Sequence, residues 1–313
     1  MFDEMVSLIG DLAPNEGYTR SLLEDVRFMR SNRPLGRTPV IYEPSIVIVC
    51  QGHKRGYLAD KVYFYDKQHY LVLSVPLPFS TETEASPQEP LLAVTVSLDR
   101  TVLSELVMLL DTPDSPPNAA PEGIISTPLD APLADTTLRL LRALSSPQEA
   151  KVIGPQLVRE LYYRALVGER GGAIRAALVN QGHFANIARV LQRIHLDYPQ
   201  PLPIDILASD AGLSVPAFHK HFKVVTGTSP LQYIKSVRLN QARLLMIRDN
   251  MTAASAAFRV GYESPSQFNR EFRRFFDRSP GEEAREMKAA FSFCRRYKPW
   301  LQTADRGALY LNI

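Results

Sequence analysis

The 313-residue sequence predicts an α+β chain with a small N-terminal β-barrel and its flanking helices, followed by an all-α domain. That second domain is predicted to hold two helix-turn-helix units joined by a long helix. Two observations carry the prediction. Apolar, strand-like runs follow one another between Val26 and Leu98 with turn residues between them, as in small barrels and sandwiches. Over residues 203–283, one helical pattern occurs twice at an offset of fifty.

The barrel elements follow from the spacing of apolar residues. A short helix is expected over 2–12, with Met5 and Ile9 on its apolar side. Residues 46–50 form a buried-strand run bounded by Pro44 and Gly52. Residues 81–84 are expected to form a polar, exposed strand. The other expected strands are 57–58 and 62–65, which form a hairpin, 70–73, and 91–96. A closed barrel of this size can enclose one small ligand.

Helices are expected after the barrel, at 100–110, 134–144, 155–167 and 173–181, with a Pro-rich loop at 111–121. The predicted domains are 1–182 and 183–300, although Gly168 and Gly171 are competing boundaries. The second domain opens with a helix whose apolar residues recur at i, i+3, i+4 and i+7 from Ile187. Another helix, over 282–290, closes it. The stretch 291–300 is predicted to be a partly docked extension rather than a nucleic-acid tail.

The long linking helix is expected over 231–248, with one apolar stripe that includes Leu231 and Leu245. Arg238 falls in that stripe. Two interpretations remain open: Arg238 reaches an acidic partner within the domain, which we favour, or it reaches a DNA phosphate.

The repeat has the form of a helix-turn-helix unit: a short helix, a turn at glycine, and a second helix that opens on serine. In the second copy, Ser264 is expected to cap the helix and Pro265 to occupy its first turn. Ser214, Phe218, Lys220, Phe222, Lys223, Ser229 and Pro230 recur as Ser264, Phe268, Arg270, Phe272, Arg273, Ser279 and Pro280. A helical repeat array is the alternative, but arrays usually need three or more copies.

Phe268 and Phe272 lie four residues apart and are expected to pack inward, which turns Arg270 elsewhere. Arginine, asparagine and glutamine are suited to base edges, and cations are suited to phosphates. His219, Ser266, Gln267 and Arg270 are the candidates for base contacts. The full predicted DNA-binding set is Ala217, His219, Lys220, Lys223, Ser266, Gln267, Asn269, Arg270, Arg273 and Arg274.

Charge is distributed unevenly along the chain. The net charge is +3, but residues 186–300 hold 18 Lys/Arg against 10 Asp/Glu, and residues 1–185 hold 17 against 22. A basic C-terminal part fits binding of a polyanion by one domain. No apolar run is long enough to span a membrane, the first residues lack the basic start of a signal peptide, and Cys50 and Cys294 suggest no disulfide framework. We therefore expect a cytoplasmic protein.

No catalytic or metal-binding constellation stands out. The barrel region holds only two histidines, His53 and His69, so transition-metal chemistry is not expected there. Nucleophile-elbow, phosphate-loop, dinucleotide and Cys-x-x-Cys motifs do not occur. Cys50 lies in an apolar run, and inert packing is favoured over a sensing role. We expect no enzyme activity, no metal and no cofactor.

The repeat resembles the DNA-binding domain of AraC/XylS-type regulators over residues 187–290. The resemblance rests on Leu207-Ala208, Leu213-Ser214, Gly227, Arg238-Leu239 and Gly261-Tyr262, together with the repeated positions above. It implies a module whose two recognition helices enter successive major grooves of double-stranded promoter DNA, ~34 Å apart. Lys220 stands where the family usually has arginine, and Pro216 and Ala217 replace polar or aromatic residues.

Residues 20–110 resemble the cupin-like effector domain of one AraC-type subgroup, on Val40 to Ser45, Gln51-Gly52 with Lys54, and Tyr65-Asp66 with Tyr70-Leu71. This resemblance implies a transcription regulator controlled by a small-molecule effector, with contact to the transcription machinery. The helices over 134–181 then either pack against the barrel of their own chain or form the interface of a homodimer. Two other functions remain open: a cupin-type enzyme with a DNA-binding tail, and a sequence-neutral architectural DNA binder. The sequence identifies neither the effector nor the residues that bind it, and does not decide between activation and repression.

Overall fold

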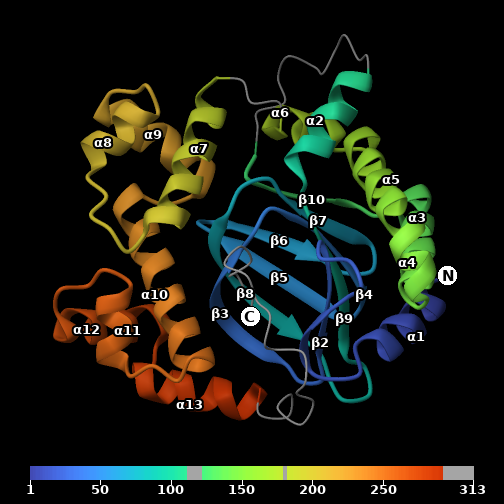
Figure 1. The fold of residues 1–313 in the computed structure, drawn as a ribbon, viewed down its shortest axis with the longest axis horizontal. Helices are drawn as coiled ribbons and strands as arrows, with labels where there is room; N and C mark the ends of the chain where they lie inside the picture. The colour runs from blue at the N-terminus through green and yellow to red at the C-terminus, as the bar shows by residue number, and fades with distance from the viewer. Residues whose placement is uncertain (111–121, 179–181, 292–313) are drawn as a thin grey trace. The chain divides into compact units, whose positions relative to one another are not determined.

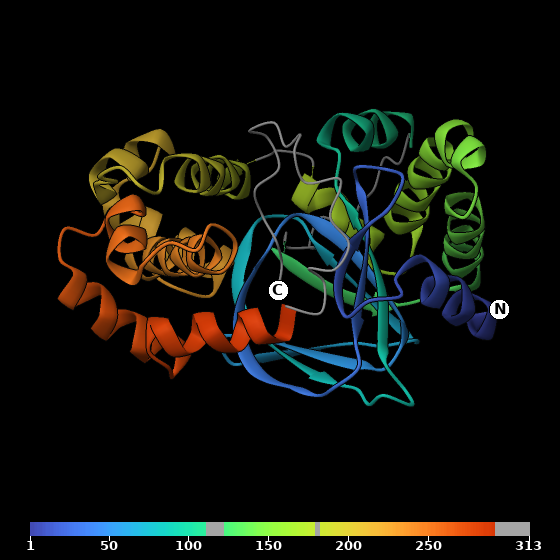
Figure 2. The ribbon, with the colours of Figure 1, turned by 60° about the horizontal axis from the view of Figure 1, so that its bottom comes forward.

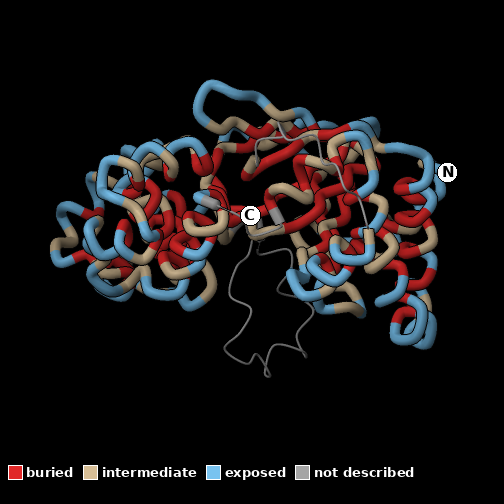
Figure 3. Tube along the Cα trace, turned by 90° about the horizontal axis from the view of Figure 1, so that it is seen from above, coloured by how far each residue is buried: buried red, intermediate tan, exposed pale blue. Residues whose placement is uncertain are grey.

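The computed structural model describes residues 1–110, 122–178 and 182–291. The chain forms two compact units: Met1–Arg37 with Tyr42–Ala185, and Thr38–Ile41 with the chain from Asn186 onward. Figure 3 shows buried segments concentrated inside each unit and exposed segments on its loops. The predicted domain limits, 1–182 and 183–300, stay a prediction.

Apart from Thr38–Ile41, the chain up to Pro128 builds the first unit on two β-sheets (Figure 1). The larger, with strand order β1-β2-β9-β4-β7-β10, is antiparallel throughout, and the smaller has the order β3-β8-β5-β6. The strands are β1 (Gly17–Arg20), β2 (Val26–Ser31), β3 (Leu35–Tyr42), β4 (Ser45–Gln51), β5 (His53–Leu58), β6 (Lys61–Tyr65), β7 (His69–Leu73), β8 (Leu77–Glu84), β9 (Leu91–Ser97) and β10 (Ile124–Pro128).

Strand β4 is central to the larger sheet and is buried on both faces. Because successive strand residues point to opposite faces, Ile46 and Ile48 join the core under the helices, and Val47 and Val49 point to the other side. This explains why the strand is a continuous apolar run rather than an alternating one. The helices of this unit are α1 (Phe2–Leu12), α2 (Arg100–Leu109), α3 (Ala131–Leu144), α4 (Pro147–Val152), α5 (Gly154–Val167) and α6 (Gly171–Leu178).

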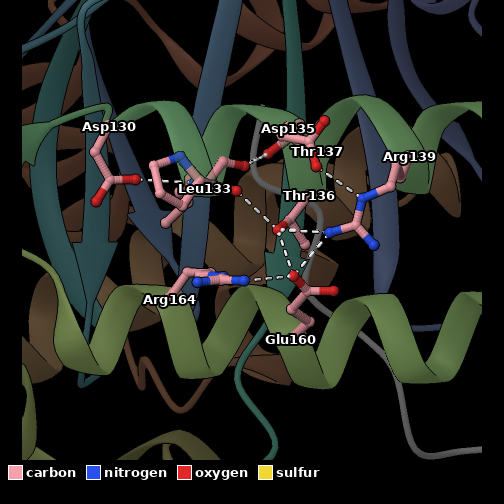
Figure 4. A network of polar contacts seen from close by, with 9 residues as sticks. Asp130, Leu133, Asp135, Thr136, Thr137, Arg139, Glu160 and Arg164 are labelled. Atoms are coloured by element: carbon pink, nitrogen blue, oxygen red, sulfur yellow. Dashed lines mark hydrogen bonds and ion pairs between the residues drawn. The ribbon is translucent and has the colours of Figure 1, made fainter.

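A polar network joins α3 to α5 (Figure 4). Glu160 of α5 accepts hydrogen bonds from Arg139 at 2.7 Å, Arg164 at 3.0 Å and Thr136 at 3.2 Å. The Arg139 hydrogen bond is the main reason why the pKa of Glu160 falls to about 2. Glu160 is therefore ionised over the physiological pH range and fixes α5 along α3.

The second unit is helical: α7 (Gly182–Asp197), α8 (Ile204–Asp210), α9 (Val215–Thr226), α10 (Pro230–Arg248), α11 (Ala253–Arg259), α12 (Pro265–Phe276) and α13 (Pro280–Phe291). Helix α10 connects the α8–α9 pair to the α11–α12 pair (Figure 1), and α13 packs on α10 and α12 (Figure 2). The Nε2 atom of His195 in α7 lies 2.8 Å from the Tyr233 hydroxyl in α10. Burial lowers the pKa of His195 to about 4. The His195 imidazole is therefore neutral at pH 7, as suits a buried hydrogen bond between α7 and α10.

Most predicted elements are confirmed within one to three residues, and the fold class is confirmed. The hairpin turns at Ala59, which has a positive φ of 51°. Strands β1, β2, β3 and β10 and helix α4 were not predicted individually. The expectations for residues 111–121, for Cys294 and for most of 291–300 lie outside the described residues.

Two expectations are wrong. Residues 81–84 are not an exposed strand: Thr81 and Thr83 are buried and the glutamates alternate outward, because the strand has one inward face. Helix α10 is not buried along a single stripe. Leu231 is 52% exposed, whereas Asn240 and Arg243 are buried, because α9, α11, α12 and α13 pack around different sides of the helix.

Candidate nucleic-acid interface

Both copies of the repeat form helix-turn-helix units, α8–α9 and α11–α12. Each turn contains a glycine with positive φ, 62° at Gly212 and 88° at Gly261. At Gly261 a Cβ would lie 2.3 Å from the Pro199 carbonyl oxygen, so both conformation and space require glycine. Ser264 Oγ accepts the Gln267 backbone N–H at 3.3 Å with Pro265 in the first turn, as predicted.

Aromatic side chains fix the inward faces of α9 and α12. Phe218 and Phe222, and fifty residues later Phe268 and Phe272, are fully buried. The paired ring centroids lie 5.3 Å apart in α9 and 5.4 Å apart in α12. Since each helical residue advances about 100°, the residue at position 220 or 270 falls opposite the phenylalanines.

The outward faces hold the predicted DNA contacts. Ala217 is half-buried and the other nine are exposed. Within the described part of the chain, the cations among them form no ion pair with a carboxylate, so their charge is available to a polyanion; these are Lys220, Lys223, Arg270, Arg273 and Arg274. Their role in DNA binding stays a prediction.

The two faces differ in chemistry. Helix α12 has Ser266 and Arg274 where α9 has Pro216 and Val224, and the Val224 side chain is 74% exposed. Helix α9 therefore has fewer cations and more exposed apolar surface than α12. An apolar surface of this kind can contact thymine methyl groups, whereas polar side chains hydrogen-bond base edges.

Glu271 organises one edge of α12. It accepts hydrogen bonds from Lys235 and Tyr262, each at 2.8 Å, and from the Gln267 side chain at 3.2 Å. Burial acts to raise the pKa of Glu271, but these donors outweigh it and hold the pKa below its usual value. The Gln267 amide, a predicted base contact, is thereby oriented by Glu271. No sequence pattern indicated this network, because its members lie on three different elements.

Arg238 connects the parts of the second unit, but through carbonyls rather than the acidic partner favoured from sequence. Its guanidinium donates to the backbone oxygens of Tyr198 at 2.8 Å, Gln200 at 2.8 Å and Gly261 at 3.2 Å. The first two lie in the turn after α7 and the third in the second helix-turn-helix turn. Arg238 therefore positions both turns and is not free to contact phosphate.

The barrel residues singled out from sequence show no reactive chemistry. Cys50 is buried, and burial raises its pKa to about 12, which favours packing over sensing. Across the described ranges, no group of three or more His, Cys, Asp and Glu side chains could hold a metal ion. Nor does any helix in those ranges have the length and apolar character needed to cross a membrane.

The structure also reveals a site that the sequence did not indicate. Lys54 of β5 points between the two sheets and is 3% exposed, and its ammonium lies 2.7 Å from the Tyr42 hydroxyl. Only its inward position in the β5 strand could have signalled this, because a lone lysine in a strand is usually exposed.

The fold and these surfaces define a protein that combines a double helix-turn-helix unit with a small barrel. Comparisons agree. Residues 22–173 match the family described as AraC-type transcriptional regulator N-terminus, and residues 207–286 match the helix-turn-helix domain family. The chain belongs to the AraC-type family of transcriptional regulators.

Individual relatives are distant. The HTH-type transcriptional activator RhaS of Klebsiella pneumoniae (strain 342) is 26% identical over 140 residues, 45% of this chain and 49% of RhaS. The match thus spans about half of that relative. The apo form of a ToxT variant from Vibrio cholerae strain SCE256 aligns with a TM-score of 0.56 at 11% identity, covering 86% of this chain and 98% of ToxT. Wild-type ToxT with a bound unsaturated fatty acid aligns with a TM-score of 0.55 at 13% identity, covering 84% and 95%. These two likenesses concern the fold alone.

Proposed function

We propose that the chain is a sequence-specific DNA-binding transcription regulator, with α9 and α12 as its recognition helices. The observation that carries the proposal is the repeat itself: two helix-turn-helix units with exposed cations at matching positions, Lys220 with Arg270 and Lys223 with Arg273. Such cations release counterions from phosphates and give salt-dependent affinity. The exposed polar residues of α12 then supply base discrimination.

The barrel is proposed to bind a small-molecule effector. Family membership supports this, and so does the similar fold of ToxT, which has been solved with an unsaturated fatty acid. An effector can change DNA affinity only by as much as its affinities for the two states of the protein differ. A homodimer and contact with the transcription machinery complete the proposal.

Selection of binding sites from random double-stranded DNA by the full chain tests the proposal. A sequence-specific regulator yields two short half-motifs about one helical turn apart. An unenriched pool with strong salt-dependent binding would instead identify an architectural binder, and no binding at low salt would refute DNA recognition. Repeating the selection with candidate metabolites tests the effector role, since an effector shifts the yield of the same motif.

A further inference from the structure

The interior of the barrel holds a lysine whose charge is not compensated. Lys54 projects from the smaller sheet toward the larger one, where its ammonium approaches the Met29 sulfur at 3.5 Å. The rings of Tyr42 and Tyr65 have their centroids 5.5 and 6.0 Å from the ammonium. No carboxylate in the described residues forms an ion pair with Lys54. Burial of an ammonium without a counter-ion is unfavourable, and it lowers the pKa of Lys54 to about 7.

Two further side chains with hydroxyl groups share the inward face with Lys54. Tyr65 lies directly opposite Lys54 on β6, and Thr83 lies opposite it on β8, so all three side chains share the inward face. Burial raises the pKa of Tyr65, and the nearby Tyr42 hydroxyl offsets only part of that rise. Within the described residues the Tyr65 hydroxyl completes no hydrogen bond of full geometry, although the Tyr42 hydroxyl is close enough to interact with it. Buried polar groups nearly always have partners, so this hydroxyl beside an uncompensated ammonium needs an explanation.

An anionic oxygen group would provide a partner for both the Lys54 ammonium and the Tyr65 hydroxyl. It would accept hydrogen bonds from the ammonium and the Tyr65 hydroxyl and would supply the missing negative charge. A single cation matches a monoanion such as a carboxylate better than a phosphate monoester, which carries nearly two negative charges at pH 7. The neighbouring Met29 and Phe79 are buried and apolar, so they suit the rest of an organic acid.

We propose that Lys54, Tyr65 and Tyr42 form the head-group site of the effector, and that the effector is a carboxylic acid with an apolar body. The inference rests on the proposed effector role of the barrel. It assigns a ligand class and three contact residues to that role. Lys54 makes the ion pair, Tyr65 donates a second hydrogen bond, and Tyr42 holds the ammonium in place through its hydroxyl.

The test measures the melting temperature and affinity of the full chain with octanoate and benzoate, against the neutral octanamide and benzamide. The carboxylates should raise the melting temperature and the amides should not. Lys54→Met should fold, because removal of an uncompensated buried charge is tolerated, and it should bind the carboxylates at least about tenfold more weakly. Tyr65→Phe removes a hydroxyl that completes no hydrogen bond of full geometry within the described residues, and it should weaken binding less than Lys54→Met does. Lys67→Met, which removes an exposed lysine near the same hairpin, should behave like the wild type.

Any of three results would overturn the proposal. The first is an equal shift of the melting temperature with acids and amides, and the second is no shift with either acid. The third is carboxylate binding by Lys54→Met that equals that of the wild type. DNA selection is measured separately. If the chain selects two half-motifs but gives one of these results, the proposed function stands and the proposed head-group site is refuted. A chain that selects no DNA loses the proposed function whatever its response to acids.

Discussion

Arg243 and Glu283 offer a direct test of how the second unit is held together. Arg243 of α10 and Glu283 of α13 form an ion pair, Nη1 to Oε1 at 3.4 Å, with side chains only 3% and 5% exposed. The guanidinium also lies 4.6 Å from the Phe276 ring centroid at the end of α12. The pair therefore lies where α10, α12 and α13 meet, in the unit whose α12 surface we propose binds DNA.

Glu283→Leu leaves a buried arginine without its counter-charge. Breaking a buried pair in this way costs about 3–5 kcal/mol of unfolding free energy. Replacing both partners, Arg243→Met with Glu283→Leu, should recover most of that loss, because Arg243 Nε has no acceptor within the described chain and the native geometry is imperfect. Glu286→Leu, one turn further along α13 and exposed, should cost under about 1 kcal/mol.

Urea unfolding followed by helical circular dichroism measures all four proteins. We predict that the double variant and Glu286→Leu are nearly as stable as the wild type. Glu283→Leu should be much less stable than all three. A Glu283→Leu protein within about 1 kcal/mol of the wild type would show that Arg243 is hydrated or paired elsewhere, and would refute the buried-pair reasoning.

Four other changes test separate contacts of the molecule. Arg270→Ala should lower specific DNA affinity by about 1–3 kcal/mol and relax base preference at one position, whereas the charge-matched Arg285→Ala should not; a uniform loss on all sequences would limit Arg270 to phosphate contact. Arg238→Met should cost about 3 kcal/mol in urea unfolding, because three backbone carbonyls lose a charged donor, and an unchanged midpoint would contradict that role. Replacing thymine by deoxyuridine in the half-motif bound by α9 should cost about 1 kcal/mol per methyl group in a titration, with a smaller effect in the α12 half-motif; equal effects would argue against apolar readout. For Lys54, the folded pKa of about 7 lies below the unfolded value of 10.5, so the unfolded chain holds more protons between these values. Unfolding free energy should then rise across that pH window by up to about 1.4 kcal/mol per pH unit relative to Lys54→Met, and parallel curves would mean that Lys54 keeps its proton.

The helical unit could be predicted closely from the sequence because its information is local. The fifty-residue offset, Ser264 and the glycines of the turns define where helices start and stop, and the phenylalanines define which face is inward. Tertiary contacts were not accessible in the same way. Arg238 was expected to meet an acid, yet it meets carbonyls from two distant turns, and such acceptors carry no sequence signature.

The barrel was harder to predict because burial on an inward strand face is decided by the opposite sheet. Thr81 and Thr83 alternate with glutamates and so appear exposed, but the threonine side faces the interior. Lys54 shows the same effect more strongly, since a lysine in a short strand gives no local sign of burial. Strand β10 was missed because it pairs with β7 from far along the chain.

Binding of α9 and α12 to two half-motifs on one side of the duplex can be measured with a spacing change in the DNA. One titration uses the selected site, and a second uses the same site with about five extra base pairs between the half-motifs, because half a helical turn moves one half-motif to the opposite side. We predict that the insertion lowers affinity to that of a single half-motif. Equal affinity for both DNAs would contradict recognition by two helices of one chain.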